Sequence, residues 1–125
     1  MDTKAIAEFI GTLLHSATIT HYMHLQAQGE GSYAAHVALG DYYDGIVEAV
    51  DAVAECIQGA YDIIIEPYPN AYANTSAEPL EYIKSLRAYV RNKRNDLPQD
   101  SEIQNEVDTI ANLINRTCYK LERLR

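Results

Sequence analysis

Two histidines and a row of carboxylates are the residues in this sequence whose types and spacing could bind a metal ion. His24 and His36 lie twelve positions apart, on either side of a short glycine-containing link that would bring their imidazoles together. The carboxylates recur at intervals of four, three and four residues, at Asp44, Glu48, Asp51 and Glu55. This spacing stacks them on one flank of a helix. Mixed imidazole and carboxylate ligands suit ferrous iron, and an ordinary solvated face is the alternative interpretation.

A metal site that contains both His36 and Asp51 requires two copies of the chain. The two residues are fifteen positions apart on one predicted helix, which is roughly 22 Å at about 1.5 Å per residue. Metal ligands lie only about 2.0 to 2.2 Å from the ion. Two antiparallel helices related by a two-fold axis would instead place Asp51 and Glu55 of one copy opposite His24 and His36 of the other. We therefore expect self-association through this helix.

The axis of that contact would pass near Tyr43 and Asp44. Gly40 and Gly45 flank this point, and each costs about 1 kcal/mol inside a helix relative to alanine. Close approach of a second backbone would be a reason to keep them.

The hydrophobic pattern predicts four helices, over residues 3–27, 32–60, 77–96 and from 101 to the end of the chain. In the second helix, the residues expected to face inward are Leu39, Tyr43, Ile46, Val47, Val50, Val53, Ala54 and Ile57. Ser32 is the expected N-cap of this helix, and capping boxes are expected at Thr75–Glu78 and Ser101–Gln104. Residues 61–76 read as a long crossing loop held to the bundle by Ile63, Ile64 and Ile65. Two helices, a long connection and two more helices predict an all-α, ferritin-like four-helix bundle with one long crossover.

Composition limits the class of protein. The 125 residues fit a single domain over 1–125, and the net charge of −8 argues against phosphate-backbone binding as the main activity. No apolar run approaches the roughly 18 residues of a membrane span, so we predict a cytoplasmic protein with neither membrane nor clear nucleic-acid binding. Cys56 and Cys118 are expected to be buried free thiols. His15 and His21 are expected to be structural, and Tyr61, Tyr68 and Tyr72 to form a contact surface.

The segment HYMHLQAQGEGSYAAHVALGDYYDGIVEAVDAVAEC resembles the Dps-like (miniferritin) branch of the ferritin superfamily. That family's motif is two histidines twelve positions apart, followed by an aspartate and then a glutamate four positions later. Here these positions are His24, His36, Asp51 and Glu55. The resemblance implies metal sites at a two-fold subunit interface, oxidation of Fe(II), and a hollow shell of twelve subunits. The last helix is also similar to small ferritin-like proteins of tailed bacteriophages, in which case the compartment would be the host cytoplasm.

Gly40 stands where that family has a further aspartate, so five ligands become four. A site of this kind would bind iron more weakly, or would hold zinc or no metal. A non-enzymatic phage structural or interaction protein on the same bundle is therefore a second interpretation. A magnesium-dependent all-α nucleotide pyrophosphohydrolase is a third, since Glu48 and Asp51 form a Glu-X-X-Asp pair. Its partner Glu-X-X-Glu motif is absent from the sequence.

Overall fold

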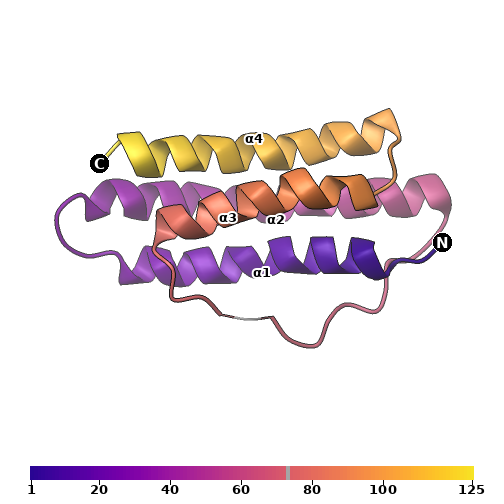
Figure 1. Cartoon of the computed structure of the whole chain (residues 1–125), viewed down its shortest axis with the longest axis horizontal. Helices are drawn as coiled ribbons and strands as arrows, with labels where there is room; N and C mark the ends of the chain where they lie inside the picture. Colours follow the sequence, from indigo (N-terminus) through magenta and orange to yellow (C-terminus); the bar gives the residue numbers. More distant parts are fainter. Residues whose placement is uncertain (73) are drawn as a thin grey trace.

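The computed structural model describes residues 1–72 and 74–125, which form four α-helices and one turn of 3-10 helix (Figure 1). The elements are α1 (Lys4–Gln26), α2 (Ser32–Tyr61), α3 (Pro79–Lys93), η1 (Arg94–Asp96) and α4 (Ser101–Arg123). No strand occurs among these residues. The predicted all-α class and the positions of the four helices are confirmed.

The helices form two antiparallel pairs joined by a crossing segment. A short turn over residues 27–31 folds α2 back along α1. Residues 62–72 and 74–78 then lie along the length of the bundle between α2 and the start of α3 (Figure 1). α2 packs against α1 and α4, while α3 packs against α4 and α1. α2 and α3 consequently run in the same direction at opposite corners of the bundle.

The core consists mainly of aliphatic side chains from all four helices. On α2 the buried residues are Ala38, Leu39, Tyr42, Ile46, Ala49, Val50, Val53 and Ile57. Tyr42, rather than the predicted Tyr43, therefore reaches the interior, and Val47 is exposed. Both differences concern how α2 is turned about its own axis. The two neighbouring tyrosines, for example, fit a three-and-four spacing equally well.

Buried polar side chains join α1 to α2. Tyr42 is fully buried, and its hydroxyl lies 2.8 Å from Ser16 Oγ. The Ser16 hydroxyl donates to the Leu13 carbonyl at 2.6 Å, so the Tyr42 hydroxyl acts as donor to Ser16. Burial raises the pKa of the Tyr42 hydroxyl.

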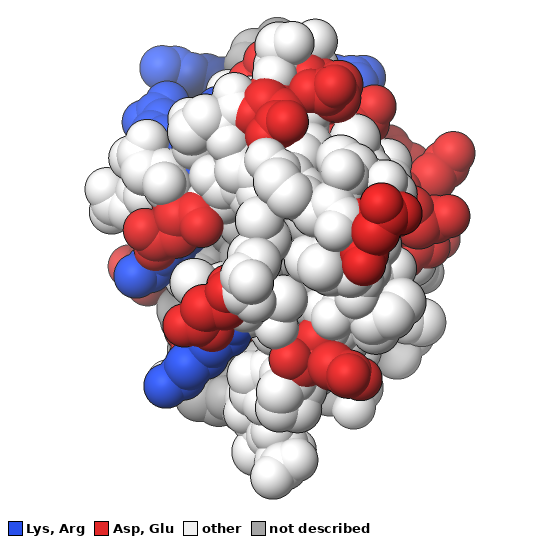
Figure 2. Space-filling view, turned by 90° about the vertical axis from the view of Figure 1, so that its right-hand side faces the viewer, with Lys and Arg blue, Asp and Glu red and all other residues white. Residues whose placement is uncertain are grey.

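Charge is distributed unevenly over the bundle. Viewed along the helices from the end at which α2 finishes, most Lys and Arg side chains lie along one edge with some Asp and Glu between them, and further Asp and Glu side chains occupy the centre and the other side (Figure 2). None of the helices in the described ranges is long and apolar enough to cross a membrane.

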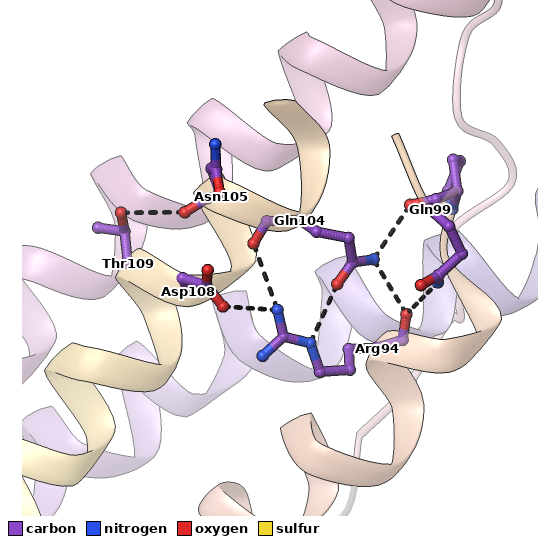
Figure 3. A network of polar contacts seen from close by, with 7 residues as sticks. Arg94, Gln99, Gln104, Asn105, Asp108 and Thr109 are labelled. Atoms are coloured by element: carbon purple, nitrogen blue, oxygen red, sulfur yellow. Dashed lines mark hydrogen bonds and ion pairs between the residues drawn. The ribbon is translucent and has the colours of Figure 1, made fainter. Parts of the chain in front are cut away.

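The predicted capping residues have other roles. α2 begins at Ser32 with Gly31 as its N-cap, and Asp100 is the N-cap of α4. Gln104 does not close a capping box with Ser101; its amide donates to the carbonyls of Arg94 and Pro98, at 3.2 and 3.0 Å (Figure 3). Gln104 makes these bonds because η1 and the residues that follow it place the Arg94 and Pro98 carbonyls beside its amide.

Arg94 completes the connection between α3 and α4. Its guanidinium donates to the Gln104 side chain at 3.0 Å and pairs with Asp108 at 2.6 Å (Figure 3). Arg94 of η1 is thus joined to Gln104 and Asp108 in the first turns of α4.

The crossing segment is anchored near its start and near its middle. Ile65 is buried in the core, as predicted, whereas Ile64 is exposed. The Ile65 amide donates to the Gln58 side chain at 3.0 Å. Farther along, the Tyr72 ring stacks on His15 with ring centroids 5.0 Å apart.

Candidate metal-ligand site

His24 and His36 meet at the closed end of the α1–α2 pair. Their rings are stacked, with centroids 3.6 Å apart and planes inclined by 18°. His24 lies in the last turn of α1 and His36 near the start of α2, so the turn over residues 27–31 brings them together. The predicted convergence of these two imidazoles is confirmed.

Each histidine is held by the backbone of the other. His24 Nδ1 lies 2.6 Å from the His36 carbonyl, and His36 Nδ1 lies 2.8 Å from the His24 carbonyl. A carbonyl only accepts hydrogen bonds, so both rings carry a proton on Nδ1, and in a neutral ring Nε2 keeps its lone pair. Metal-binding histidines commonly have this arrangement, in which a backbone carbonyl fixes the tautomer and ring orientation. Each of the two rings therefore has the tautomer of a neutral nitrogen ligand.

Gly40 provides the space for the His24 ring. A Cβ atom at Gly40 would lie 3.3 Å from both Cε1 and Nδ1 of His24. A Cβ at Gly45 would lie 3.3 Å from a methyl group of Leu113 on α4. Both glycines thus have packing partners within the chain. Close approach of a second copy is not needed to explain why these positions are glycine.

Two further aromatic rings extend the histidine pair. His21 stacks on Tyr43 with centroids 4.2 Å apart, and Tyr43 meets His24 edge to face at 5.3 Å. Tyr43 thus packs on α1 and not in the core. Its pairing with His21 could have been suspected only from the antiparallel register of the two helices.

The predicted carboxylate ligands lie far from the histidines of the same chain. Asp51 and Glu55 are exposed on the outer face of α2, in line with Asp44 and Glu48. α2 is continuous from Ser32 to Tyr61, so the estimate of roughly 22 Å between His36 and Asp51 holds. Within the two described ranges, no group of three or more His, Cys, Asp or Glu side chains is placed to hold a metal. A four-ligand site therefore requires a second copy.

Exposed apolar residues surround the histidine pair and continue along α2. Leu25 is 69% exposed and Tyr33 is 78% exposed, and Val37 and Val47 also reach solvent. Large apolar side chains gathered on one surface are typical of an interaction site. The helical spacing did not reveal this surface, because it predicted that Val47 lies in the core.

A cavity of about 1000 Å³ lies at the same end of the bundle. Its apolar lining includes Ile19, Met23, Leu39, Leu80 and Leu121, and its rim is formed by residues of the α1–α2 turn and residues 74–78. Neither His24 nor His36 lines it. The cavity is therefore separate from the candidate metal ligands.

Comparison with known proteins gives a family without an assigned activity. No curated protein and no solved structure matches the chain. A family model matches residues 24–121, a range that contains all four candidate ligands. The chain belongs to this family, DUF5856, which is described as a family of unknown function.

Proposed function

We propose that this protein binds iron at sites formed between two copies of the chain and oxidises Fe(II) there. His24 and His36 of one copy would supply neutral nitrogen ligands, and Asp51 and Glu55 of the other would supply carboxylates. Iron is the substrate in this proposal, and oxygen or peroxide is the oxidant. The observation that carries the proposal is the reciprocal Nδ1-to-carbonyl bonding, which leaves both Nε2 atoms available.

The outer face of α2 supports a contact between copies. It carries the exposed carboxylates together with exposed Tyr33, Val37 and Val47, and α2 contains no lysine or arginine. In an antiparallel contact centred near Tyr43 and Asp44, Asp51 would lie close to His36 of the other copy. Bound cations would offset the repulsion between the two rows of carboxylates, so we expect the contact to depend on metal.

The arrangement of the helices agrees with a ferritin-like bundle. α1 and α2 form one antiparallel pair, α3 and α4 form the other, and a long segment crosses between them. We propose the two-fold contact as the first step of assembly and a shell of twelve copies as its product. In such a shell, oxidised iron would collect on the inner surface.

A test of the proposal compares Fe(II) oxidation by the parent with that by the His24→Ala/His36→Ala variant. We expect the variant to lose the protein-dependent part of the rate. His15→Ala/His21→Ala removes the same number of imidazoles from positions outside the ligand set, and it should keep that rate. Circular dichroism would check that both variants fold. A ligand variant that oxidised Fe(II) as fast as the parent would remove the assignment.

A non-enzymatic interaction protein is the second candidate. The exposed Leu25, Tyr33, Val37 and Val47 favour it, because they offer a contact surface whether or not metal binds. It predicts self-association in the presence of a chelator that Fe(II) does not change. The parent's solution mass with and without Fe(II) separates the two candidates.

A further inference from the structure

The two halves of the chain carry opposite charge. Lys4 is the only lysine or arginine before residue 79, although residues 1–78 contain eleven of the eighteen acidic residues. The other nine basic residues all lie in residues 79–125. Because the first half forms α1 and α2 and the second half forms α3 and α4, this bias becomes a difference between faces of the bundle.

Five basic residues lie on the α3–α4 side of the bundle, and we call them the basic face: Lys84, Arg87 and Arg91 of α3, with Arg116 and Arg123 of α4. The first three are spaced three and four positions apart and so share one side of α3. Burial raises the pKa of the Cys118 thiol on α4, and the positive charges of Lys84, Arg87 and Arg91 lower it. This side of α3 therefore faces α4. Lys84 also pairs with Glu122 of α4 at 3.4 Å.

The α4 part of the basic face is open to solvent. Arg116, Tyr119 and Arg123 are spaced three and four positions apart, and all three are exposed. No Asp or Glu within the described ranges forms an ion pair with Arg87, Arg91, Arg116 or Arg123. Apart from Lys84, which pairs with Glu122, the basic residues of this face therefore carry positive charge that no ion pair among the described residues neutralises.

The opposing surface, which we call the acidic face, comprises Asp44, Glu48, Asp51 and Glu55 of α2. These carboxylates are exposed and form no ion pair among the described residues. α2 and α3 occupy opposite corners of the bundle, so the two faces cannot meet within one copy.

We propose that the basic face of one copy docks on the acidic face of a second copy. Two rows of opposite charge are complementary, whereas two acidic faces would repel each other without bound cations. Contact between different faces is heterologous and builds rings or open chains rather than a closed pair. The contact needs no metal, and it competes with the two-fold contact because both use α2.

Salt concentration tests the electrostatic basis of the contact. At about 0.1 M salt the Debye length is about 10 Å, which screens the mutual repulsion of two copies but leaves facing charges attracted. At about 1 M it falls to about 3 Å. Sedimentation in chelator should show masses above the 14.0 kDa monomer at the lower salt and a return toward 14.0 kDa at the higher salt.

A charge exchange tests which faces meet. Arg87→Glu/Arg91→Glu reverses part of the basic face, and Asp44→Arg/Glu48→Arg reverses part of the acidic face. Each variant alone should sediment as a monomer, because reversing two charges leaves one of its two faces with little or no net charge. An equimolar mixture should associate again, because each variant offers a face complementary to the other. Both variants remain negatively charged overall, so net attraction cannot explain the recovery.

Three results would overturn the proposal: a parent that stays monomeric at about 0.1 M salt, single variants that associate like the parent, or a mixture that stays monomeric. Asp44 and Glu48 are not among the proposed metal ligands, and the measurements are made in chelator. Failure here would therefore leave the iron proposal untouched. Loss of Fe(II) oxidation would in turn leave this contact untouched.

Discussion

The position of Gly40 allows a prediction in which two opposing free energies can be compared. Replacing glycine by alanine inside a helix stabilises it by about 1 kcal/mol, through backbone entropy and solvation. At Gly40 the new methyl group would lie 3.3 Å from His24 Cε1 and Nδ1, a few tenths of an ångström too close. His24 cannot retreat easily, because it bonds to the His36 carbonyl and stacks on the His36 ring.

Gly45 is the matched control for this substitution. Its added methyl would meet Leu113 Cδ2, also at 3.3 Å, but Leu113 is half-buried and its terminal methyl groups can turn away. Gly45→Ala should therefore keep most of the gain of about 1 kcal/mol. Gly40→Ala should lose it, since displacing a hydrogen-bonded side chain costs about 0.5 to 1.5 kcal/mol.

Urea denaturation measures the free energy of unfolding of both variants, and NMR of the histidine ring protons reports on the pair. We expect Gly40→Ala to be less stable than Gly45→Ala by roughly 1 kcal/mol and to shift the His24 and His36 signals. Equal stabilisation by both substitutions, with unchanged histidine signals, would refute the assignment of Gly40 as the space for His24.

Three further predictions concern stability. Ser16→Ala should lower the free energy of unfolding by about 1 to 3 kcal/mol, because it leaves the buried Tyr42 hydroxyl unpaired. Tyr42→Phe should lower it less. In urea denaturation, the double variant should resemble Tyr42→Phe. Burial raises the pKa of the Tyr42 hydroxyl above that of the unfolded chain, so its stabilising effect is complete below about pH 10 and is lost as pH rises further, by about 1.4 kcal/mol per unit. Unfolding measured between pH 8 and pH 12 should show this fall in the parent and a smaller fall in Tyr42→Phe; equal falls would contradict it. A Cβ at Gly11 would overlap the Tyr72 hydroxyl, so Gly11→Ala should release the crossing segment and speed its cleavage in limited proteolysis, whereas Gly59→Ala, with open space around it, should not.

The helices could be predicted from the sequence because their apolar residues recur with helical spacing. Ser32 and Ser101 begin α2 and α4, as expected within one residue. The orientation of α2 about its axis was harder to predict. Tyr42 and Tyr43 both fit the spacing, and the structure separates them because Tyr42 bonds to Ser16 while Tyr43 stacks on His21.

The contacts of individual side chains depend on partners distant in sequence. Gln104 was predicted to cap α4, but Arg94 and Pro98 compete for its amide. The convergence of His24 and His36 was predictable because a short turn separates them. The fit of the His24 ring against Gly40 was not, since it depends on how that ring is turned. That Asp51 and Glu55 form a metal site together with the histidines of another copy remains a prediction.

A mixture of two inactive variants tests most directly whether the iron site is shared between copies. His24→Ala/His36→Ala lacks the imidazoles, and Asp51→Asn/Glu55→Gln lacks the carboxylates, so each should fail to oxidise Fe(II) alone. In a mixed dimer, the intact histidines of one copy face the intact carboxylates of the other and form one complete site. An equimolar mixture should therefore recover roughly a quarter of the parent's sites, since about half of the dimers are mixed and each has one of its two sites complete. A mixture with no more activity than its separate components would contradict the shared site.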